Sequence, residues 1–310
     1  MRGSCERGQT TVEWVGLVSL VSLLAAAVLV SGLPVPGGAL ARSIASRILC
    51  AAALADECGD ESALIAAYGD EVGRLVRHHM PTIAFEEGSR AVPVDFRRCR
   101  STTCGDGRQD GQVWRSGTNL RVTAFVHVVD CRSGHAADTE AAGADCTGER
   151  AGNLYLEYFT YYADSATLRG IPIVGDEGYH ADDWEGVEIR IGAGGEVDER
   201  ASSHNGFNYS LDDANQSSDL GIGLLKDLDE ISGFRPENGW GPETHLLLVS
   251  GGSHAGNATG QERGGRYTPA RRVHLVPLEP IASGESGYRF SISAPWRKRI
   301  WTDPETDRTN

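Results

Sequence analysis

A run of 20 residues without a charged side chain, from Trp14 to Leu33, restricts the folding of this chain more than any other feature of its sequence. About 20 consecutive apolar residues are what a helix needs to cross a bilayer. A cleavable secretory signal, the alternative, has a shorter apolar core and a stronger small-x-small exit. Arg2 and Arg7 precede the run, so the positive-inside tendency leaves the N-terminus in the cytoplasm. We therefore expect a single-pass protein of the cell membrane, with the residues from Pro34 onward on the extracytoplasmic side.

The residues just before this span, Arg7 to Trp14, resemble the processing site of type IV and Tad-type pilin-like proteins. In that family a peptidase cuts after a glycine, here Gly8, and the glutamate at the fifth mature position, here Glu13, neutralises the amino terminus of a neighbouring subunit. The resemblance implies pilin-like subunits as partners. The alternative is an uncleaved anchor with an incidental glutamate, which would have to reach the interface because a carboxylate in an apolar helix is costly.

The charge balance argues against nucleic acid as a partner. Acidic side chains outnumber basic ones by 43 to 29, which gives a net charge of −14. A chain this acidic repels phosphate backbones rather than collecting them. The remaining partner classes are membranes, small ligands, cations and other proteins.

The seven cysteines become six if the chain is cut after Gly8, because the cut removes Cys5. An even number of cysteines in an oxidising compartment predicts disulfide bonds, and six permit 15 pairings. Short loops cost little closure entropy, so local pairs are favoured. Zinc is the poorer alternative because no CxxC spacing occurs. The expected pairs are Cys50 with Cys58, Cys99 with Cys104, and Cys131 with Cys146.

The sequence divides into three parts: residues 1–33 with the processing site and the span, 34–80, and 81–310. A linker from Pro34 to Gly38 opens the second part. Two helices follow, over Ala39–Ala55 and Glu61–His79, and we expect them to form a stalk packed on the third part. The second of them has apolar residues at helical spacing. These are Leu64, Ile65, Tyr68, Val72, Leu75 and Val76.

Beyond Pro81 the sequence consists of short apolar runs separated by Gly, Asn and Asp, which is typical of strands and turns. No regular helices alternate with these runs, so a mostly antiparallel β-sandwich is favoured over a βαβ fold. One helix is expected, over Asp219–Ile231. The clearest strands are Leu120–Val129, Leu154–Tyr162, Trp184–Ile191, His245–Ser250, Arg272–Pro277 and Tyr288–Ala294.

The segment from Tyr179 to Ile191 carries the most chemistry. In a strand its side chains alternate between two faces, so Asp183 and Glu185 share the face that continues as Val187 and Ile189. Burial of two carboxylates at the end of a core-facing row costs about 3–5 kcal/mol of folding free energy unless protons, arginines or a cation compensate their charges.

A divalent cation compensates two carboxylates at once, and oxygen ligands suit Ca²⁺ or Mg²⁺ better than zinc. His180 could bind such a cation directly or hold a coordinated water. The alternative is an arginine-paired cluster that only fixes the strand register, since ion-pair networks imitate sites.

The hexapeptide from His180 to Glu185 resembles the HRHDWE core of the necrosis- and ethylene-inducing-like proteins, although Ala181 and Asp182 replace the motif's Arg and second His. The aromatic segment from Tyr158 to Asp164 is similar to their strand that ends in an aspartate. The resemblance implies a β-sandwich with a divalent-metal site at one end that engages a glycan or lipid head group. The residues it carries over as metal ligands are Asp164, with Asp176 as a substitute, and His180, Asp183 and Glu185.

A second resemblance, to the vacuolar-sorting-associated sixty-two-like family, extends from about Pro81 to Glu305. It rests on four segments, and one of them places His254 just after an apolar strand, where it is a candidate metal ligand or water-orienting group. The segments are Ala84–Phe96, the DWE strand, Gly252–Ala255 and Trp296–Glu305.

These observations favour a membrane-anchored cell-surface binding module with a Ca²⁺ or Mg²⁺ site. Two alternatives stay open. In a metal-dependent hydrolase of phosphoester or glycan substrates, the metal would activate water, with Glu185 or His254 as the base. In a pilus-associated subunit, the globular domain would be carried on a pilin-like helix.

Overall fold

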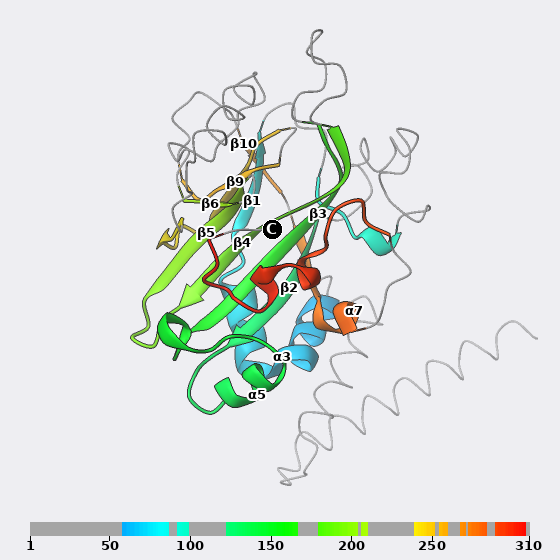
Figure 1. The fold of residues 1–310 in the computed structure, drawn as a ribbon. Helices are drawn as coiled ribbons and strands as arrows, with labels where there is room; N and C mark the ends of the chain where they lie inside the picture. The colour runs from blue at the N-terminus through cyan, green and yellow to red at the C-terminus, as the bar shows by residue number, and fades with distance from the viewer. Residues whose placement is uncertain are drawn as a thin grey trace, which may run out of the picture. The chain divides into compact units, whose positions relative to one another are not determined.

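The computed structural model describes two β-sheets and a set of mostly short helices (Figure 1). Contacts divide the chain into one unit ending at Ser62 and a second from Ala63 to Asn310. No helix among the described residues is long and apolar enough to span a membrane, and the predicted span Trp14–Leu33 lies outside them. The described ranges are 58–86, 92–98, 122–166, 179–203, 206–209, 239–251, 254–259, 267–270, 272–283 and 289–307.

The larger of two sheets has seven strands in the order β11-β2-β3-β4-β5-β6, with β7 paired to β5. Its centre is a long antiparallel ladder between β3 and β4, in which Leu154 lies opposite Ile191 and Ser165 opposite His180. The edge strand β11 runs parallel to β2. The strands are β2 (Val122–Asp130), β3 (Leu154–Ala166), β4 (Tyr179–Ile191), β5 (Val197–Ser203), β6 (Gly206–Asn208), β7 (Gly241–Pro242) and β11 (Val273–Pro277).

The smaller sheet has four strands in the order β10-β1-β8-β9. Its two inner strands, β1 (Thr82–Glu86) and β8 (Leu246–Val249), are parallel, although far apart in the sequence. The outer strands β9 (Gly256–Asn257) and β10 (Tyr267–Pro269) pair antiparallel to them.

Helices are few and short apart from α3 (Cys58–His78), which confirms the helix predicted over Glu61–His79. It contains a break at Gly69, where φ is +80°, a conformation that glycine adopts at little cost. The other helical segments are η1 (Phe96–Arg98), α5 (Ala136–Ala141), η2 (Gly148–Arg150), α7 (Glu279–Ser283), η4 (Pro295–Arg297) and η5 (Arg299–Trp301).

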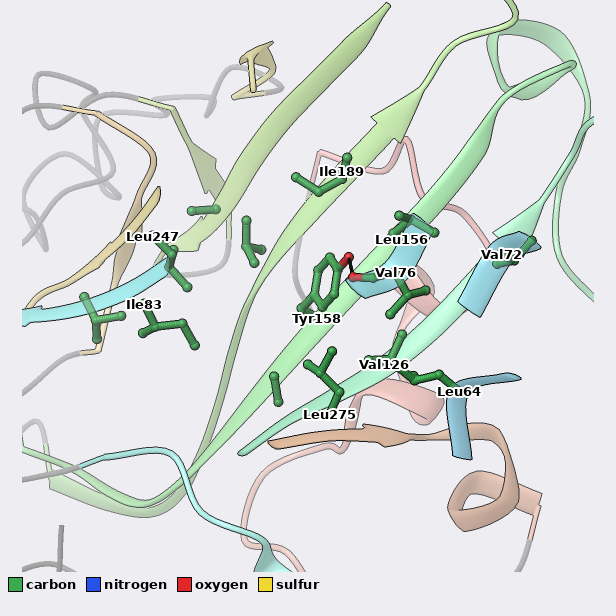
Figure 2. Close-up of a cluster of buried hydrophobic side chains, with 14 of the residues drawn as sticks. Leu64, Val72, Val76, Ile83, Val126, Leu156, Tyr158, Ile189, Leu247 and Leu275 are labelled. Carbon is green, nitrogen blue, oxygen red and sulfur yellow. Dashed lines mark hydrogen bonds between the residues drawn. The ribbon is translucent and has the colours of Figure 1, made fainter. Parts of the chain in front are cut away.

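One apolar core joins α3 to both sheets (Figure 2). Leu64 and Val76 of α3 lie in it with Ile83 of the small sheet and Leu156 of the large one. Tyr158 crosses this core and donates a hydrogen bond of 2.7 Å from its hydroxyl to the Val76 carbonyl. Each large aliphatic side chain buried here stabilises the fold by about 1.5–3 kcal/mol. The helix therefore contributes its apolar residues to the core that both sheets share.

The other face of the large sheet carries a second, aromatic core. Phe96 packs edge-on against Trp184 and Tyr161, with ring centroids 5.7 Å apart in both pairs. Phe290 packs against the same rings. Alternation along β3 and β4 thus sends Trp184 and Tyr161 to this face, and Val187 and Tyr158 to the α3 face.

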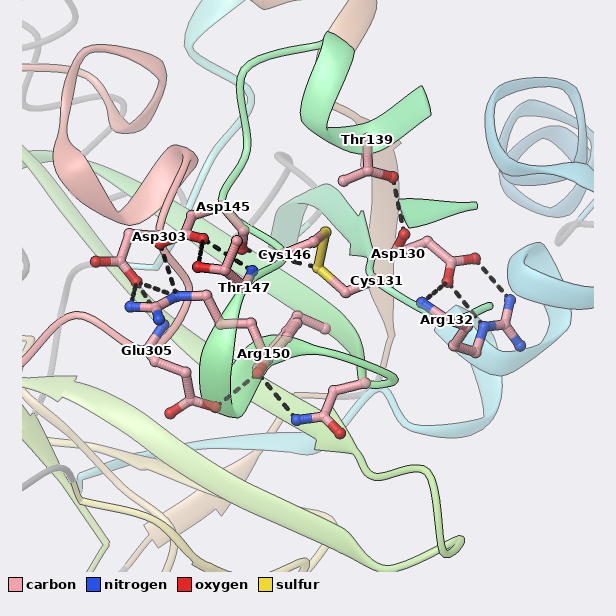
Figure 3. Close-up of a disulfide and its surroundings, with 12 residues drawn as sticks. Asp130, Cys131, Arg132, Thr139, Asp145, Cys146, Thr147, Arg150, Asp303 and Glu305 are labelled. Atoms are coloured by element: carbon pink, nitrogen blue, oxygen red, sulfur yellow. Dashed lines mark hydrogen bonds and ion pairs between the residues drawn. A yellow bond between two sulfur atoms is a disulfide. The ribbon is translucent and has the colours of Figure 1, made fainter. Parts of the chain in front are cut away.

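The predicted pair Cys131–Cys146 is a disulfide that closes the segment between β2 and β3 (Figure 3). Beside it Arg150 forms an ion pair with Asp303, which ties this segment to the C-terminal part of the chain. The other two predicted pairs involve Cys50, Cys99 and Cys104, which lie outside the described residues, and Cys58, whose side chain is not described.

The structure is mainly β with two sheets, as predicted, and is consistent with the β-sandwich. The strand predicted over Tyr288–Ala294 is wrong for its described part, because residues 289–294 form no strand. Their alternation reflects other contacts: Phe290 enters the aromatic core, and the Ser291 amide binds the Asp182 carboxylate at 2.6 Å. The predicted helices Ala39–Ala55 and Asp219–Ile231 lie outside the described residues.

Candidate functional site

Asp183 and Glu185 lie near the middle of β4, on the face that carries the α3 core. Asp183 is opposite Tyr162 and Glu185 is opposite Thr160 in the β3–β4 ladder, and Val187 follows on the same face. Asp183 is buried and Glu185 is partly buried. The structure therefore has the shared face that strand alternation predicts, with two carboxylates at the end of an apolar row.

His254 contacts Asp183 directly. Its Nδ1 lies 2.8 Å from Asp183 Oδ2, and because a carboxylate only accepts, Nδ1 donates. The imidazole is stacked on the Tyr162 ring with 3.8 Å between centroids and 4° between planes. Only 2% of His254 is exposed. Two of the five predicted ligands, from segments 71 residues apart, are thus brought together and held rigidly.

Glu185 lies in an environment that disfavours its charge. Burial, and then repulsion from Asp183, raises the pKa of Glu185 well above its usual range. The ammonium of Lys298 acts in the opposite direction, and burial lowers the pKa of that lysine. A basic segment in an acidic protein is expected to pair with acids, but no spacing rule indicates that Lys298 would face these two.

His180 and Asp164 lie on the same stretch of the β3–β4 pair but are directed differently. His180 is exposed, and its Nδ1 donates to the Asp182 carbonyl at 2.7 Å. Asp164 is buried and lies opposite Ala181. Within the described ranges, His180 makes no hydrogen bond or ion pair with the other four predicted ligands. The substitute ligand Asp176 lies outside those ranges.

Asp182 explains this divergence. Its φ is +59°, an uncommon conformation for a residue other than glycine, and its side chain is fully buried toward the aromatic core. Its carboxylate accepts hydrogen bonds from the Tyr161 hydroxyl and the Ser291 amide. Asp182 is therefore an anchor for the segment around Ser291, a role that sequence reasoning missed.

The possible ligand atoms around Asp183 do not form a complete cation site among the described residues. Nowhere in the described ranges are three or more His, Cys, Asp or Glu side chains grouped so that they could hold a metal ion as they stand. Oxygen donors of the kind that Ca²⁺ and Mg²⁺ prefer are present in Asp183 and Glu185. One Asp183 oxygen is engaged by His254, which leaves the other for a ligand.

Comparison with known proteins gives no family for this chain. No family model matches it, and no curated protein matches it. One solved structure, described as "Toxin fold for microbial attack and plant defense", is similar with 14% sequence identity and a TM-score of 0.32. That match covers 68% of this chain and 75% of the other. A likeness at this level supports no statement on the fold or the function of this protein.

The opposite face of the large sheet carries a buried row of charged residues, one from each of four neighbouring strands. His127 lies opposite Glu157, Glu157 opposite Glu188, and Glu188 opposite Arg200. Arg200 donates to Glu188 Oε2 from Nε at 2.9 Å and from Nη2 at 2.8 Å. Glu157 is fully buried, and neither carboxylate oxygen has a hydrogen-bond partner among the described residues. Burial, and then the charge of Glu188, raises the pKa of Glu157 well above its usual range.

The C-terminal segment covers this row, and in Figure 1 it crosses in front of β2 and β4 (red). The Trp301 ring stacks on His127 with 3.5 Å between centroids, and the Trp301 carbonyl lies 3.1 Å from His127 Nε2. Farther along, the Pro304 carbonyl accepts a hydrogen bond of 2.7 Å from Arg200. A cavity of about 10 Å³, close to the room needed by one water molecule, lies beside Glu188. Such a cavity is too small for an organic substrate.

Proposed function

We propose that this protein is an extracytoplasmic binding module that holds a divalent cation, Ca²⁺ or Mg²⁺, at Asp183 and Glu185. The observation that supports the proposal is the lack of an arginine partner for these two acids among the described residues. Four other buried acids of the unit are paired with arginine: Glu188 with Arg200, Glu305 with Arg190, Asp303 with Arg150 and Asp95 with Arg97. Asp183 instead contacts a histidine, and the cation that acts on Glu185 among the described residues is Lys298.

In this proposal His254 orients Asp183 through its Nδ1, as outer-shell partners orient metal ligands. Asp164 and His180 are further candidate ligands on the same stretch of the β3–β4 pair. The cation would link the module to an anionic or hydroxyl-rich group at the cell surface, such as a glycan or a lipid head group. The apolar run Trp14–Leu33 would hold the module at the membrane.

The test is cation-dependent stability of the purified full chain. Thermal unfolding is measured with and without Ca²⁺ or Mg²⁺ for the unmutated protein, Asp183→Asn and Glu185→Gln. A cation at about 100 times its Kd stabilises the folded state by about 2.7 kcal/mol, so the unmutated midpoint should rise and those of both variants should not. Asp198→Asn, which changes an arginine-paired acid of β5, is the matched control and should respond like the unmutated protein. Equal shifts of the unfolding midpoint in all four proteins would show that no cation binds at Asp183 and Glu185.

A second function, hydrolysis of phosphoester or glycan substrates, is favoured by one observation. The Nδ1 contact from His254 to Asp183 is the arrangement in which a carboxylate orients a general-base histidine. If the protein is such an enzyme, turnover of model phosphodiesters or glycans should disappear in His254→Gln. It should persist in His135→Gln, which changes an exposed histidine before α5.

A further inference from the structure

Three histidines gather where α3 ends and β8 begins. The ring centroids of His78 and His79 are 4.8 Å apart, and that of His245 is 6.0 Å and 6.3 Å from them. The small sheet fixes this arrangement, because β1 and β8 are parallel with Thr82 opposite Leu246. The Thr82 amide also donates to the His245 carbonyl at 2.9 Å. Residues just before β1 therefore lie beside residues just before β8.

Glu243 contacts the Nδ1 atoms of two of these rings. Its Oε1 lies 2.7 Å from His79 Nδ1 and 3.2 Å from His245 Nδ1. When Nδ1 of a neutral imidazole donates to a carboxylate, Nε2 carries the free lone pair. This is the tautomer of most metal-bound histidines, whose other ring nitrogen donates to a carboxylate or a carbonyl. Glu243 thus prepares the His79 ring to bind a metal through Nε2 and lies in contact with the His245 ring.

A second buried carboxyl group lies close to this region. Glu199 is fully buried, and its Oε2 accepts hydrogen bonds from the Thr244 amide and hydroxyl at 2.7 and 2.9 Å. Its Oε1 has no hydrogen-bond partner in the part of the chain that the structure describes. The carboxylate of Glu243 and the C-terminal end of α3, which carries a partial negative charge, both lie beside the rings. The surroundings of the three rings therefore favour a cation.

Accessibility differs among the three rings in a way that suits metal entry. His79 is 6% exposed and is fixed between Glu243 and the end of α3. His78 is exposed, and 54% of the His245 side chain is exposed. The three rings do not enclose a metal as they stand. A metal arriving from solvent would therefore meet the two exposed rings first.

We propose that His78, His79 and His245 form a site for Zn²⁺ or a similar transition metal, with Glu243 as the carboxylate that orients His79. Imidazole nitrogen is a ligand typical of zinc, copper and nickel, whereas Ca²⁺ and Mg²⁺ prefer oxygen. Three protein ligands leave a fourth position for water or for a group of a partner molecule. This site shares no residue with Asp183 and Glu185, since His245 precedes β8 and His254 follows it.

The test is titration of the full chain with Zn²⁺ and with Co²⁺, followed by calorimetry and visible absorption. The variants are His78→Ala and His245→Asn. Asparagine suits position 245 because φ there is +56°, and asparagine tolerates that conformation better than most residues. We expect one ion per chain, an affinity at least tenfold lower in each variant, and an unchanged affinity in His135→Ala. Glu243→Gln should lower the affinity by about 10–100-fold.

Binding by histidine should give a tetrahedral Co²⁺ spectrum without a thiolate-to-cobalt band, which separates this site from the cysteines of the chain. Three results would overturn the proposal: no binding, the same affinity in His245→Asn as in the unmutated protein, or a thiolate band. Asp183→Asn should leave Zn²⁺ binding unchanged. This proposal and the Ca²⁺ or Mg²⁺ proposal can therefore fail separately.

Discussion

At the residue scale, the buried row across the large sheet has the strongest consequence for stability. Glu188 pairs with Arg200, lies opposite Glu157, and is also affected by the charges of Glu305 and Asp303. Burial dominates these effects and raises the pKa of Glu188 from 4.5 to about 7. The folded protein therefore holds this proton more tightly than the unfolded chain does.

A carboxyl group with a raised pKa in the folded state stabilises the protein most below its unfolded pKa, and this contribution is lost as the pH rises through the folded pKa. For Glu188 the window runs from about 4.5 to about 7, and the change is of the order of 2–3 kcal/mol. Urea unfolding at pH 5 and pH 8 should show a smaller loss of stability in Glu188→Gln than in the unmutated protein. Glu149→Gln, at an exposed position in η2, should behave as unmutated. A Glu188→Gln variant with the unmutated pH dependence would contradict this assignment.

Some properties of single residues can be predicted from the sequence, and others cannot. The pairing of Asp183 and Glu185 on one face follows from strand alternation, and the structure has it. The direction of His180 does not follow, because it depends on the left-handed backbone at Asp182, and no spacing rule indicates that conformation. Asp182 itself reads as a departure from a motif, yet it forms the buried hydrogen bonds that hold Ser291.

At the element scale, the C-terminal segment with η4 and η5 acts as the cover of the charged row. Its contacts are made by a few side chains, above all Trp301 stacked on His127. In Trp301→Ala the stacked ring is lost and water reaches a row of buried charges. We expect a loss of roughly 2–4 kcal/mol in the free energy of unfolding.

Chemical denaturation of Trp301→Ala measures this loss. Arg297→Ala changes an exposed side chain of the same segment and should cost less than about 0.5 kcal/mol. Equal free energies of unfolding in the two variants would mean that the contacts of Trp301 do not stabilise the fold.

Elements differ in how well their sequence indicates them. β2, β3 and β4 have long apolar runs and are predicted, whereas β5 (Val197–Ser203) is not. It contains Glu199 and Arg200, which are both buried and which give it the composition of a loop. Partners such as Thr244 for Glu199 and Glu188 for Arg200 offset the cost of this burial, and no local pattern indicates such partners. The gathering of His78, His79 and His245 is non-local in the same sense.

At the scale of the whole molecule, the Cys131–Cys146 disulfide makes the stability of the fold depend on the redox conditions of its compartment. The bond closes a loop of 15 residues beside the ion pairs of Arg150. Disulfides persist in oxidising compartments, which agrees with the proposed extracytoplasmic location.

Replacement of both cysteines by serine should lower the free energy of unfolding by about 3 kcal/mol, the closure entropy of a loop of this length. Thermal unfolding of the double variant in oxidising buffer measures the effect, and the unmutated protein with reductant should shift in the same direction. A midpoint that is unchanged by both treatments would show that the bond contributes nothing to stability.

The parallel pairing of β1 with β8 sets the order in which the chain can fold. Thr82 pairs with Leu246, about 160 residues later, whereas β2, β3, β4 and β5 each pair with the strand that follows in the sequence. Distant pairings form slowly because a large loop must close first. At about 5–20 residues per second, a ribosome needs roughly ten to thirty seconds to make the residues between the two strands. In a chain that folds during synthesis, the first strand made therefore waits, unpaired, for a partner that is among the last.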